Sequence, residues 1–144
     1  MTLAANAHPD KPLVHINDLT FSYAQVDELS GRLATSLLGL GLQRGDKVAV
    51  QLPNVPHFLF TYFGILKAGL VMVPLNPLLK AHEVAYHLDN SDAKVLVTFE
   101  LFADEAYRGG QQISAGGGAE VHKYRDNIPR RDTRLKDPTT SDNV

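Results

Sequence analysis

The sequence predicts an α/β fold in which strands and helices alternate and build a small parallel sheet, followed by a largely irregular C-terminal tail. Short apolar runs suited to buried strands alternate with longer segments whose apolar residues recur at helical spacing. The links are short, and strands joined through helices in this way pair in parallel through right-handed crossovers. The tail differs: of its 36 residues, from 109 to 144, only eight are apolar. That is too little apolar surface to offset the entropy of ordering it.

The first helix is predicted from its start signal. Leu19 to Phe21 is typical of a short extended segment, and Ser22 with Gln25 forms the Ser-x-x-Gln pattern of a capping box. The apolar residues that follow recur at helical spacing: Val26, Leu29, Leu33, Ala34 and Leu37. Gly41 is expected to terminate this helix, because glycine readily adopts the left-handed conformation found just past helix ends.

A buried strand and a strongly apolar helix come next. Lys47 to Leu52 is predicted as the strand because of its central Val-Ala-Val run. Asn54 can cap the following helix, and Pro56 is tolerated in its first turn, where no amide is needed. The helix, Phe58 to Leu66, is apolar nearly all round. A helix of that kind is expected to be buried between layers.

Two more strands and two more helices complete the pattern. Gly69 is expected to end the apolar helix at positive φ, so that the chain turns at once into a second buried strand, Val71 to Val73. Ala81 to Asn90 is predicted as a short helix, and Lys94 to Phe99 as a third strand. Leu101 to Tyr107 is expected to form the last helix.

Composition divides the chain into an α/β part, residues 1–108, and a flexible or irregular tail, residues 109–144. The net charge of −2 gives no electrostatic reason to expect a nucleic-acid partner. The chain contains no cysteine, which excludes a disulfide framework, a thiolate metal site and a cysteine nucleophile. The lack of cysteine also fits a cytoplasmic location.

Neither a signal peptide nor a transmembrane segment is expected. Met1 to Asp10 has no basic start and no apolar stretch. Phe58 to Leu75 is the most apolar run, but Lys67, Gly69 and Pro74 interrupt it. A buried helix followed by a buried strand explains this run better than a membrane-spanning helix.

The glycine-rich stretches do not match phosphate-binding motifs. Gly39, Gly41 and Gly45 have the wrong spacing for a dinucleotide fingerprint, and they follow a predicted helix rather than a strand. Helix termination and a turn explain them. The run Gly116 to Gly118 lacks the Gly-Lys-Ser/Thr of a phosphate loop, so we interpret it as a flexible linker.

Candidate metal ligands and paired carboxylates fail on spacing. A zincin helix needs His-Glu-x-x-His, but the residue four after His82 is Tyr86, and His87 lies about 140° round the helix from His82. Asp89 and Asp92 flank a predicted helix end, where acidic residues favour turns. The other histidines are expected to be solvated: His8, His15, His57 and His122. The sequence therefore predicts no catalytic, cofactor-binding or metal-ligating residue in this chain.

A family resemblance rests on several motifs that occur in order. They are Leu19-Thr-Phe-Ser-Tyr-Ala-Gln-Val26, Leu29-Ser-Gly-Arg-Leu-Ala34, Gly39 to Ala49, Leu52-Pro-Asn54, Gly64-Ile-Leu-Lys-Ala-Gly-Leu-Val-Met-Val-Pro-Leu-Asn76 and Glu83 to Lys94. Together they resemble the opening part of the adenylate-forming superfamily, which includes acyl-CoA synthetases, luciferases and peptide-synthetase adenylation domains. The resemblance covers about residues 13–108, and the motif from Gly64 to Asn76 is its most specific part.

The resemblance implies a reaction and its cofactors. Asn76-Pro-Leu-Leu-Lys80 is more similar to fatty-acyl and other carboxylate–CoA ligases than to amino-acid adenylating domains. Such ligases join a carboxylate to AMP with release of pyrophosphate, then transfer the acyl group to the thiol of CoA, using ATP, Mg²⁺ and CoA. The family's phosphate loop, Mg²⁺ carboxylate, ribose-binding acid and lid lysine have no counterpart here. Asp137 to Val144 resembles the lead-in to that loop.

We therefore expect an N-terminal fragment of an ATP-dependent acid–CoA ligase, most similar to fatty-acyl-CoA synthetases and inactive alone. The remaining part of the ligase, as a second chain, is its expected partner, and exposed apolar faces suggest self-association. The alternatives are a non-catalytic α/β interaction module and the complementing subunit of a split ligase. An independent nucleotide-binding domain is disfavoured because no phosphate-binding element is present.

Overall fold

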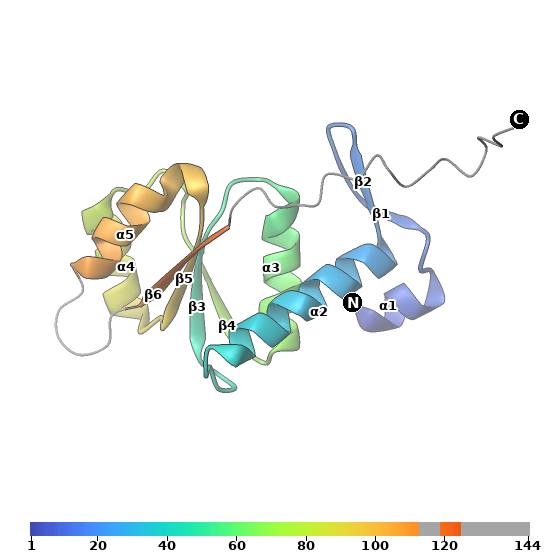
Figure 1. The fold of residues 1–144 in the computed structure, drawn as a ribbon, viewed down its shortest axis with the longest axis horizontal. Coiled ribbons are helices and arrows are strands. Elements are labelled where there is room, and N and C mark those ends of the chain that lie inside the picture. The colour runs from blue at the N-terminus through green and yellow to red at the C-terminus, as the bar shows by residue number, and fades with distance from the viewer. Residues whose placement is uncertain (113–118, 125–144) are drawn as a thin grey trace, which may run out of the picture.

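The computed structural model describes residues 1–112 and 119–124, whose elements are shown in Figure 1. In chain order they are α1 (Thr2–Ala7), β1 (Pro12–Ile16), β2 (Leu19–Ser22), α2 (Tyr23–Gly39), β3 (Lys47–Gln51), α3 (Pro56–Lys67), β4 (Val71–Pro74), α4 (Ala81–Ser91), β5 (Val95–Phe99), the 3-10 turn η1 (Glu100–Phe102), α5 (Ala103–Gln111) and β6 (Glu120–Tyr124).

A parallel sheet with the strand order β4-β3-β5-β6 forms the centre of the fold. Figure 1 shows α2 and α3 on one side of this sheet and α4 and α5 on the other. The chain goes from β3 outward to β4, then crosses back to β5 and continues to β6. The predicted α/β class with alternating elements and a small parallel sheet is therefore confirmed.

Strand periodicity divides the core into two layers. Val48 and Val50 of β3 pack with Ile65 of α3 and with the neighbouring strand on one face. Ala49 points the other way and packs with Leu88 of α4. Successive side chains of a strand lie on opposite faces, so an all-apolar strand requires helices on both sides.

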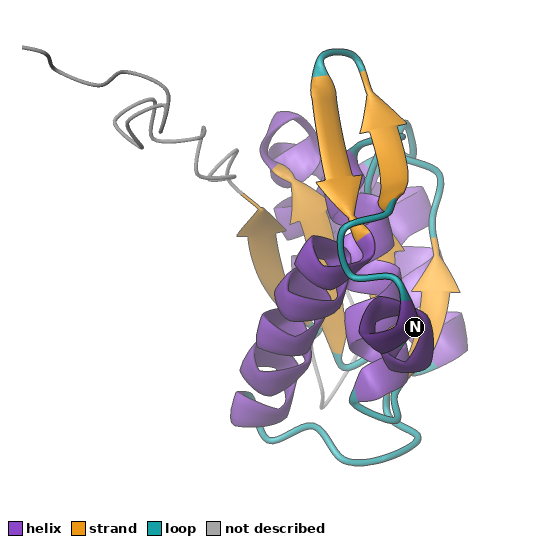
Figure 2. Ribbon diagram, turned by 90° about the vertical axis from the view of Figure 1, so that its right-hand side faces the viewer, coloured by secondary structure: helices purple, strands orange, loops and turns teal. Residues whose placement is uncertain are grey.

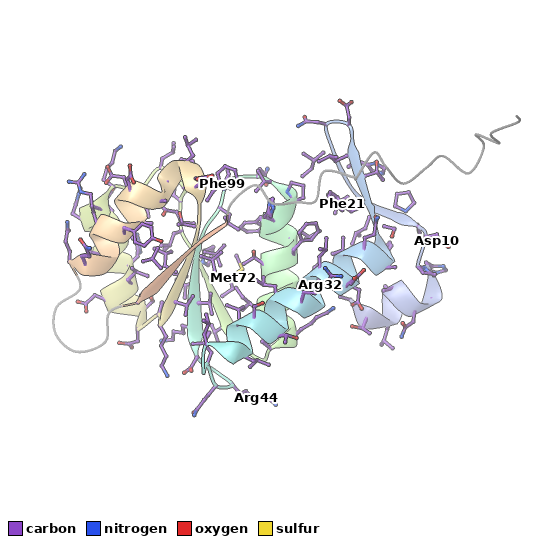
Figure 3. The ribbon with its side chains drawn as sticks, viewed as in Figure 1. Asp10, Phe21, Arg32, Arg44, Met72 and Phe99 are labelled. Carbon is purple, nitrogen blue, oxygen red and sulfur yellow. The ribbon has the colours of Figure 1, made fainter. Side chains whose placement is uncertain are left out.

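An antiparallel hairpin, β1 with β2, precedes the sheet and projects beyond the main body (Figure 2). Asn17 adopts a φ of 51° at its turn. Phe21 points from the hairpin toward the α2–α3 layer (Figure 3), and its ring packs edge-on against Phe60, with 5.2 Å between centroids. The sequence predicts only the β2 part of this hairpin, because β1 carries no run of β-formers longer than two residues.

The start of α2 confirms its predicted cap. The Ser22 hydroxyl accepts a hydrogen bond from the Gln25 amide, and the Gln25 side chain accepts one from the Ser22 amide. The N-terminal segment supplies the remaining partners, because the carbonyls of Lys11 and Pro9 accept the amides of Tyr23 and Ala24. The N-terminal arm therefore completes the cap of α2.

The tail differs from its prediction where the structure describes it. Helix α5 continues through Gly109 and Gly110 to Gln111, and residues 120–124 form β6, which pairs in parallel with β5. These residues are ordered by close tertiary contacts in spite of their low apolar content. The contacts are so close that a side chain at Gly109 would collide with α4, and one at Gly110 with Val121. Residues 113–118 and 125–144, on which the rest of the tail prediction falls, lie outside the described residues.

Two further expectations were wrong. Helix α3 starts one residue later than Asn54 allows: Val55 is its N-cap, without a side-chain hydrogen bond, and Pro56 opens the helix. Strand β4 was expected to be buried, yet Val71 is 45% exposed. Strand β4 lies at an edge of the described sheet. Its apolar composition alone therefore led to an overestimate of its burial.

Gly69 has the positive φ expected of it, 71°. Gly69→Val should lower the free energy of unfolding by about 1–3 kcal/mol, because a β-branched residue is strained in that region. Crowding of the core does not contribute, because a Cβ there would contact only the Arg44 side chain, at 3.3 Å. Urea denaturation measures the loss. Gly39→Ala is the control, because a Cβ at Gly39 meets nothing within 4 Å. Equal midpoints for Gly69→Val and the parent would contradict the strain.

Candidate functional site

The reversal of strand order defines one candidate site. In open parallel sheets, ligands bind outside the carboxyl ends of the strands at the point where the order reverses. Here that point lies between β3 and β5, since the chain proceeds to β4 on one side and to β6 on the other. Gln51 ends β3 and stands opposite Thr98 of β5.

Two buried polar side chains form a brace at this position. The Thr98 hydroxyl donates to Oε1 of Gln51 at 3.2 Å, and Nε2 of Gln51 donates to the carbonyl of Pro77 at 3.2 Å. Both side chains are fully buried, so these bonds offset their loss of water. An amide and a hydroxyl can orient a group but are poor acids and bases at neutral pH. Because Gln51 of β3 holds the carbonyl of Pro77, the brace fixes the loop between β4 and α4 over the carboxyl edge of the sheet.

The loops at this edge present apolar side chains. Leu78, after β4, is 74% exposed, and Leu101, after β5, is 78% exposed. The loop that carries Leu78 is shaped by Asn76, whose Oδ1 accepts the Leu78 amide at 2.9 Å. The edge thus combines a fixed backbone with exposed apolar contacts.

The N-terminus of α4, at the same edge, is already occupied by carboxylates. Glu83 accepts the Lys80 amide at 2.8 Å, and Glu105 reaches from α5 to accept the Ala81 amide at 2.7 Å. Helix N-termini bind phosphates through backbone amides that have no other acceptor. With two carboxylates there, the start of α4 does not fit a phosphate group.

The residues of the most specific motif join α3 to α2. Lys67 contacts Asp27 twice: Nζ lies 2.7 Å from Oδ1 and donates to the backbone carbonyl at 2.6 Å. Gly64 faces α2 so closely that a Cβ would lie 3.0 Å from the carbonyl of Ser30. This part of the motif therefore docks one helix on another, rather than presenting reactive groups.

Two aspartates have shifted pKa values. The hydrogen bond from Lys67 is the main reason why the pKa of Asp27 lies below its usual value, against an opposing effect of burial. The pKa of Asp46 is lowered first by the backbone amide of Gln43, at 2.7 Å, and then by Lys94, at 2.8 Å. Both aspartates hold turns and helices in place.

The contact between Asp27 and Lys67 should make the free energy of unfolding depend on pH. Asp27→Asn should lower the free energy of unfolding by about 1 kcal/mol at pH 7, because a charged hydrogen bond is lost. Since the folded pKa is lowered, this stability is present above the unfolded pKa, about 3.9, and is lost as pH falls through the folded pKa. The gap between parent and variant should therefore close in acid.

Melting curves between pH 7 and pH 2.5 measure that gap. Glu28→Gln is the matched control: it removes the neighbouring exposed pair with Arg32, which should change the free energy by less than about 0.5 kcal/mol. A gap that stays constant across this pH range would show that the Asp27 carboxylate is not the source.

One histidine was misjudged from sequence. His57, expected to be solvated, is buried on α3, and its ring packs edge-on near Phe60 at 6.2 Å. Thr61, one turn further, is buried as well. Their spacing of four residues in an apolar helix was the available signal. His82 is exposed and His87 half-buried. Among the described residues, no three His, Asp or Glu side chains gather to hold a metal ion.

The described part of the chain also has no helix both long and apolar enough to cross a membrane.

Comparison with known proteins identifies relatives of this chain. The profile of a family described as AMP-binding enzyme matches residues 1–142. Crotonobetaine/carnitine–CoA ligase of Salmonella typhimurium is 44% identical over 82 residues, and that of Citrobacter koseri 46%. These 82 residues are 57% of this chain and 16% of the relatives, so the match spans about a sixth of their length.

Solved structures agree in fold. A Mycobacterium tuberculosis fatty acyl CoA synthetase superposes with a TM-score of 0.75 at 28% identity, over 85% of this chain and 25% of that one. A benzoate CoA ligase from Burkholderia xenovorans gives a TM-score of 0.78 at 20% identity, over 85% of this chain and 24% of that one. At 20% identity the second likeness concerns the fold alone.

Proposed function

We propose, since this chain belongs to the AMP-binding enzyme family, that it forms the N-terminal part of an ATP-dependent acid–CoA ligase. Such a ligase converts a carboxylate and ATP to an acyl-adenylate and pyrophosphate, then passes the acyl group to the thiol of CoA with release of AMP. The observation that carries the proposal is the family match over residues 1–142, together with acid–CoA ligase relatives at 44% identity.

We propose a fatty acid as the acid, in the cytoplasm and in lipid metabolism. Support comes from Asn76 to Lys80, which resembles fatty-acyl and related ligases, and from the likeness to a fatty acyl CoA synthetase. The relatives of higher identity are named for crotonobetaine and carnitine, which are also carboxylates.

Within the ligase, this segment supplies structure rather than chemistry. Its motif residues dock α3 on α2, and its buried polar pair braces a loop. Phosphate does not fit at the start of α4, where carboxylates hold the amides. ATP, Mg²⁺ and CoA accordingly depend on the remaining part of the ligase, which we propose as the partner of this segment.

A chimera tests the proposal. Residues 1–142 replace the corresponding segment of the Salmonella typhimurium ligase, and thioester formation is assayed with ATP, CoA and carnitine. We expect the chimera to retain activity, because the segment belongs to the same fold and family. A second chimera, hosted by the Mycobacterium tuberculosis fatty acyl CoA synthetase, tests the acid class.

The outcomes separate the two parts of the proposal. Two folded chimeras, both inactive although their parents are active, would contradict a ligase role. Retention of a larger fraction of parental activity in the carnitine host than in the fatty-acyl host would contradict the fatty-acid assignment. Melting curves establish that each chimera is folded.

A further inference from the structure

Leu78 combines an exposed aliphatic side chain with a backbone that is held on both sides. Before it, the carbonyl of Pro77 accepts a hydrogen bond from Nε2 of Gln51 at 3.2 Å. After it, the Leu79 side chain packs against the core between the sheet and α4, and its amide donates to the Asn76 carbonyl at 3.2 Å. A loop with a fixed path therefore presents one leucine outward.

Leu101 lies at the same edge of the sheet. It follows β5 as Leu78 follows β4, and both strands run parallel to β3, so their carboxyl ends share one edge. Among the described residues, Leu3 near the N-terminus is the one large apolar side chain more exposed than these two. Because β3 lies between β4 and β5, the loops that carry the two leucines flank its end, where the strand order reverses.

Gln51 is the residue at the end of β3, and its side chain joins the neighbouring strand to the loop. Its Oε1 accepts the Thr98 hydroxyl of β5, and its Nε2 donates to Pro77. An amide bonded through both its oxygen and its nitrogen is held in one orientation. An aliphatic residue would fill this buried position without the cost of removing an amide from water. The amide of Gln51 therefore contributes to the path of the loop rather than to the core.

We propose that Gln51 is a positioning residue of the ligase, which holds Leu78 where it contacts the aliphatic chain of a substrate. This rests on the proposed function. An acid–CoA ligase has two substrates with such a chain, the acyl chain of a fatty acid and the pantetheine arm of CoA. Gln51 acts through the loop and does not touch the reacting atoms. Its loss should therefore weaken substrate binding and leave the chemical step intact.

Amide hydrogen exchange in the 144-residue chain tests whether Gln51 holds the loop. Gln51→Met keeps the length of the side chain and removes both hydrogen bonds. We expect the amides of Leu78 and Leu79 to exchange about tenfold faster or more in this variant. The Leu75 amide, which donates to the Val50 carbonyl at 2.8 Å, should change less than about threefold, because that bond does not involve the brace.

Ser30→Ala is the matched control. The Ser30 side chain is also buried, and its hydroxyl donates to the Val26 carbonyl within α2 at 2.7 Å. This variant loses a buried hydrogen bond outside the brace, so the amides of the loop should exchange within about twofold of the parent. If Gln51→Met fails to fold, Thr98→Val removes the bond that orients the Gln51 amide.

Steady-state kinetics tests the positioning role in the chimera hosted by the Mycobacterium tuberculosis fatty acyl CoA synthetase. KM is measured separately for a fatty acid, CoA and ATP in Gln51→Met and in Leu78→Ser, whose exposed position leaves folding intact. Each variant should raise KM about fivefold for the same substrate, with kcat and the KM for ATP within about twofold of the parent. Because Gln51 acts through Leu78, the double variant should raise KM no further than the larger single effect.

The substrate whose KM rises identifies the chain. A higher KM for the fatty acid indicates the acyl chain, and a higher KM for CoA indicates the pantetheine arm. In the second case, exchange of pyrophosphate into ATP, which does not use CoA, should keep the parental KM for the acid.

Three outcomes would overturn the positioning role. The loop amides could exchange at the parental rate in Gln51→Met, the KM for both acid and CoA could stay unchanged in the two variants, or Ser30→Ala could raise the same KM equally. An active chimera with unchanged KM values refutes only the positioning role. An inactive chimera, in which Gln51→Met still speeds exchange of the loop amides, refutes the ligase function and leaves the brace supported.

Discussion

Gly109→Val is expected to remove about 3 kcal/mol from the free energy of unfolding, because it forces a branched side chain into a closed contact between two helices. Gly109 lies in α5 where that helix packs against α4. A Cβ at this position would lie 2.8 Å from the Ala81 carbonyl and 2.8 Å from two carbon atoms of Val84. The Ala81 carbonyl belongs to the backbone of α4 and cannot move aside as a flexible side chain could. The variant therefore forces α4 and α5 apart.

Urea denaturation of the isolated chain measures this loss. The control is Gly39→Val at the end of α2, where a Cβ meets nothing within 4 Å and only a small propensity change is expected. A Gly109→Val variant within about 0.5 kcal/mol of the control would show that α4 and α5 are not in such close contact.

Much of the sheet-and-helix core could be predicted because its signals are local. The Ser22–Gln25 cap, the helical stripe of α2 and the positive φ of Gly69 each depend on residues a few positions apart. The short links then determined parallel pairing. Local patterns sufficed wherever one element carried its own start, period and end.

The remaining elements depend on distant partners. Helix α1 has only six residues and no side-chain cap, and its Thr2 reaches Asp27 for support. Strand β6 exists through its pairing with β5 and follows a stretch with few apolar residues. The burial of His57 depends on how α3 lies in the core. The partners in these contacts are far apart in the sequence, so local sequence patterns do not reveal them.

In the candidate site, too, local motifs could be predicted from the sequence and contacts between distant residues could not. The family motif was recognisable from sequence, but the structural role of Lys67 was not, because Asp27 lies 40 positions away. The brace formed by Gln51, Thr98 and Pro77 requires the register of two strands and the path of a loop. The motifs indicate the family, and the fold shows what the motif residues hold together.

The isolated chain is expected to show no acid-dependent exchange of pyrophosphate into ATP. Adenylation requires donors that stabilise negative charge on the transferring phosphates. The sequence contains no Ser/Thr/Gly-rich loop ending in Lys-Gly, and carboxylates hold the first amides of α4. In the chimera, the host supplies these groups, so exchange should return.

The most direct measurement of the central claim, that this segment carries the structure of a ligase but not its chemistry, is that exchange assay. The 144-residue chain and the Salmonella chimera are compared with carnitine and with fatty acids, using protein shown to be free of host ligases. We predict exchange at background for the chain and acid-dependent exchange for the chimera. Exchange well above background by the chain alone would contradict this claim.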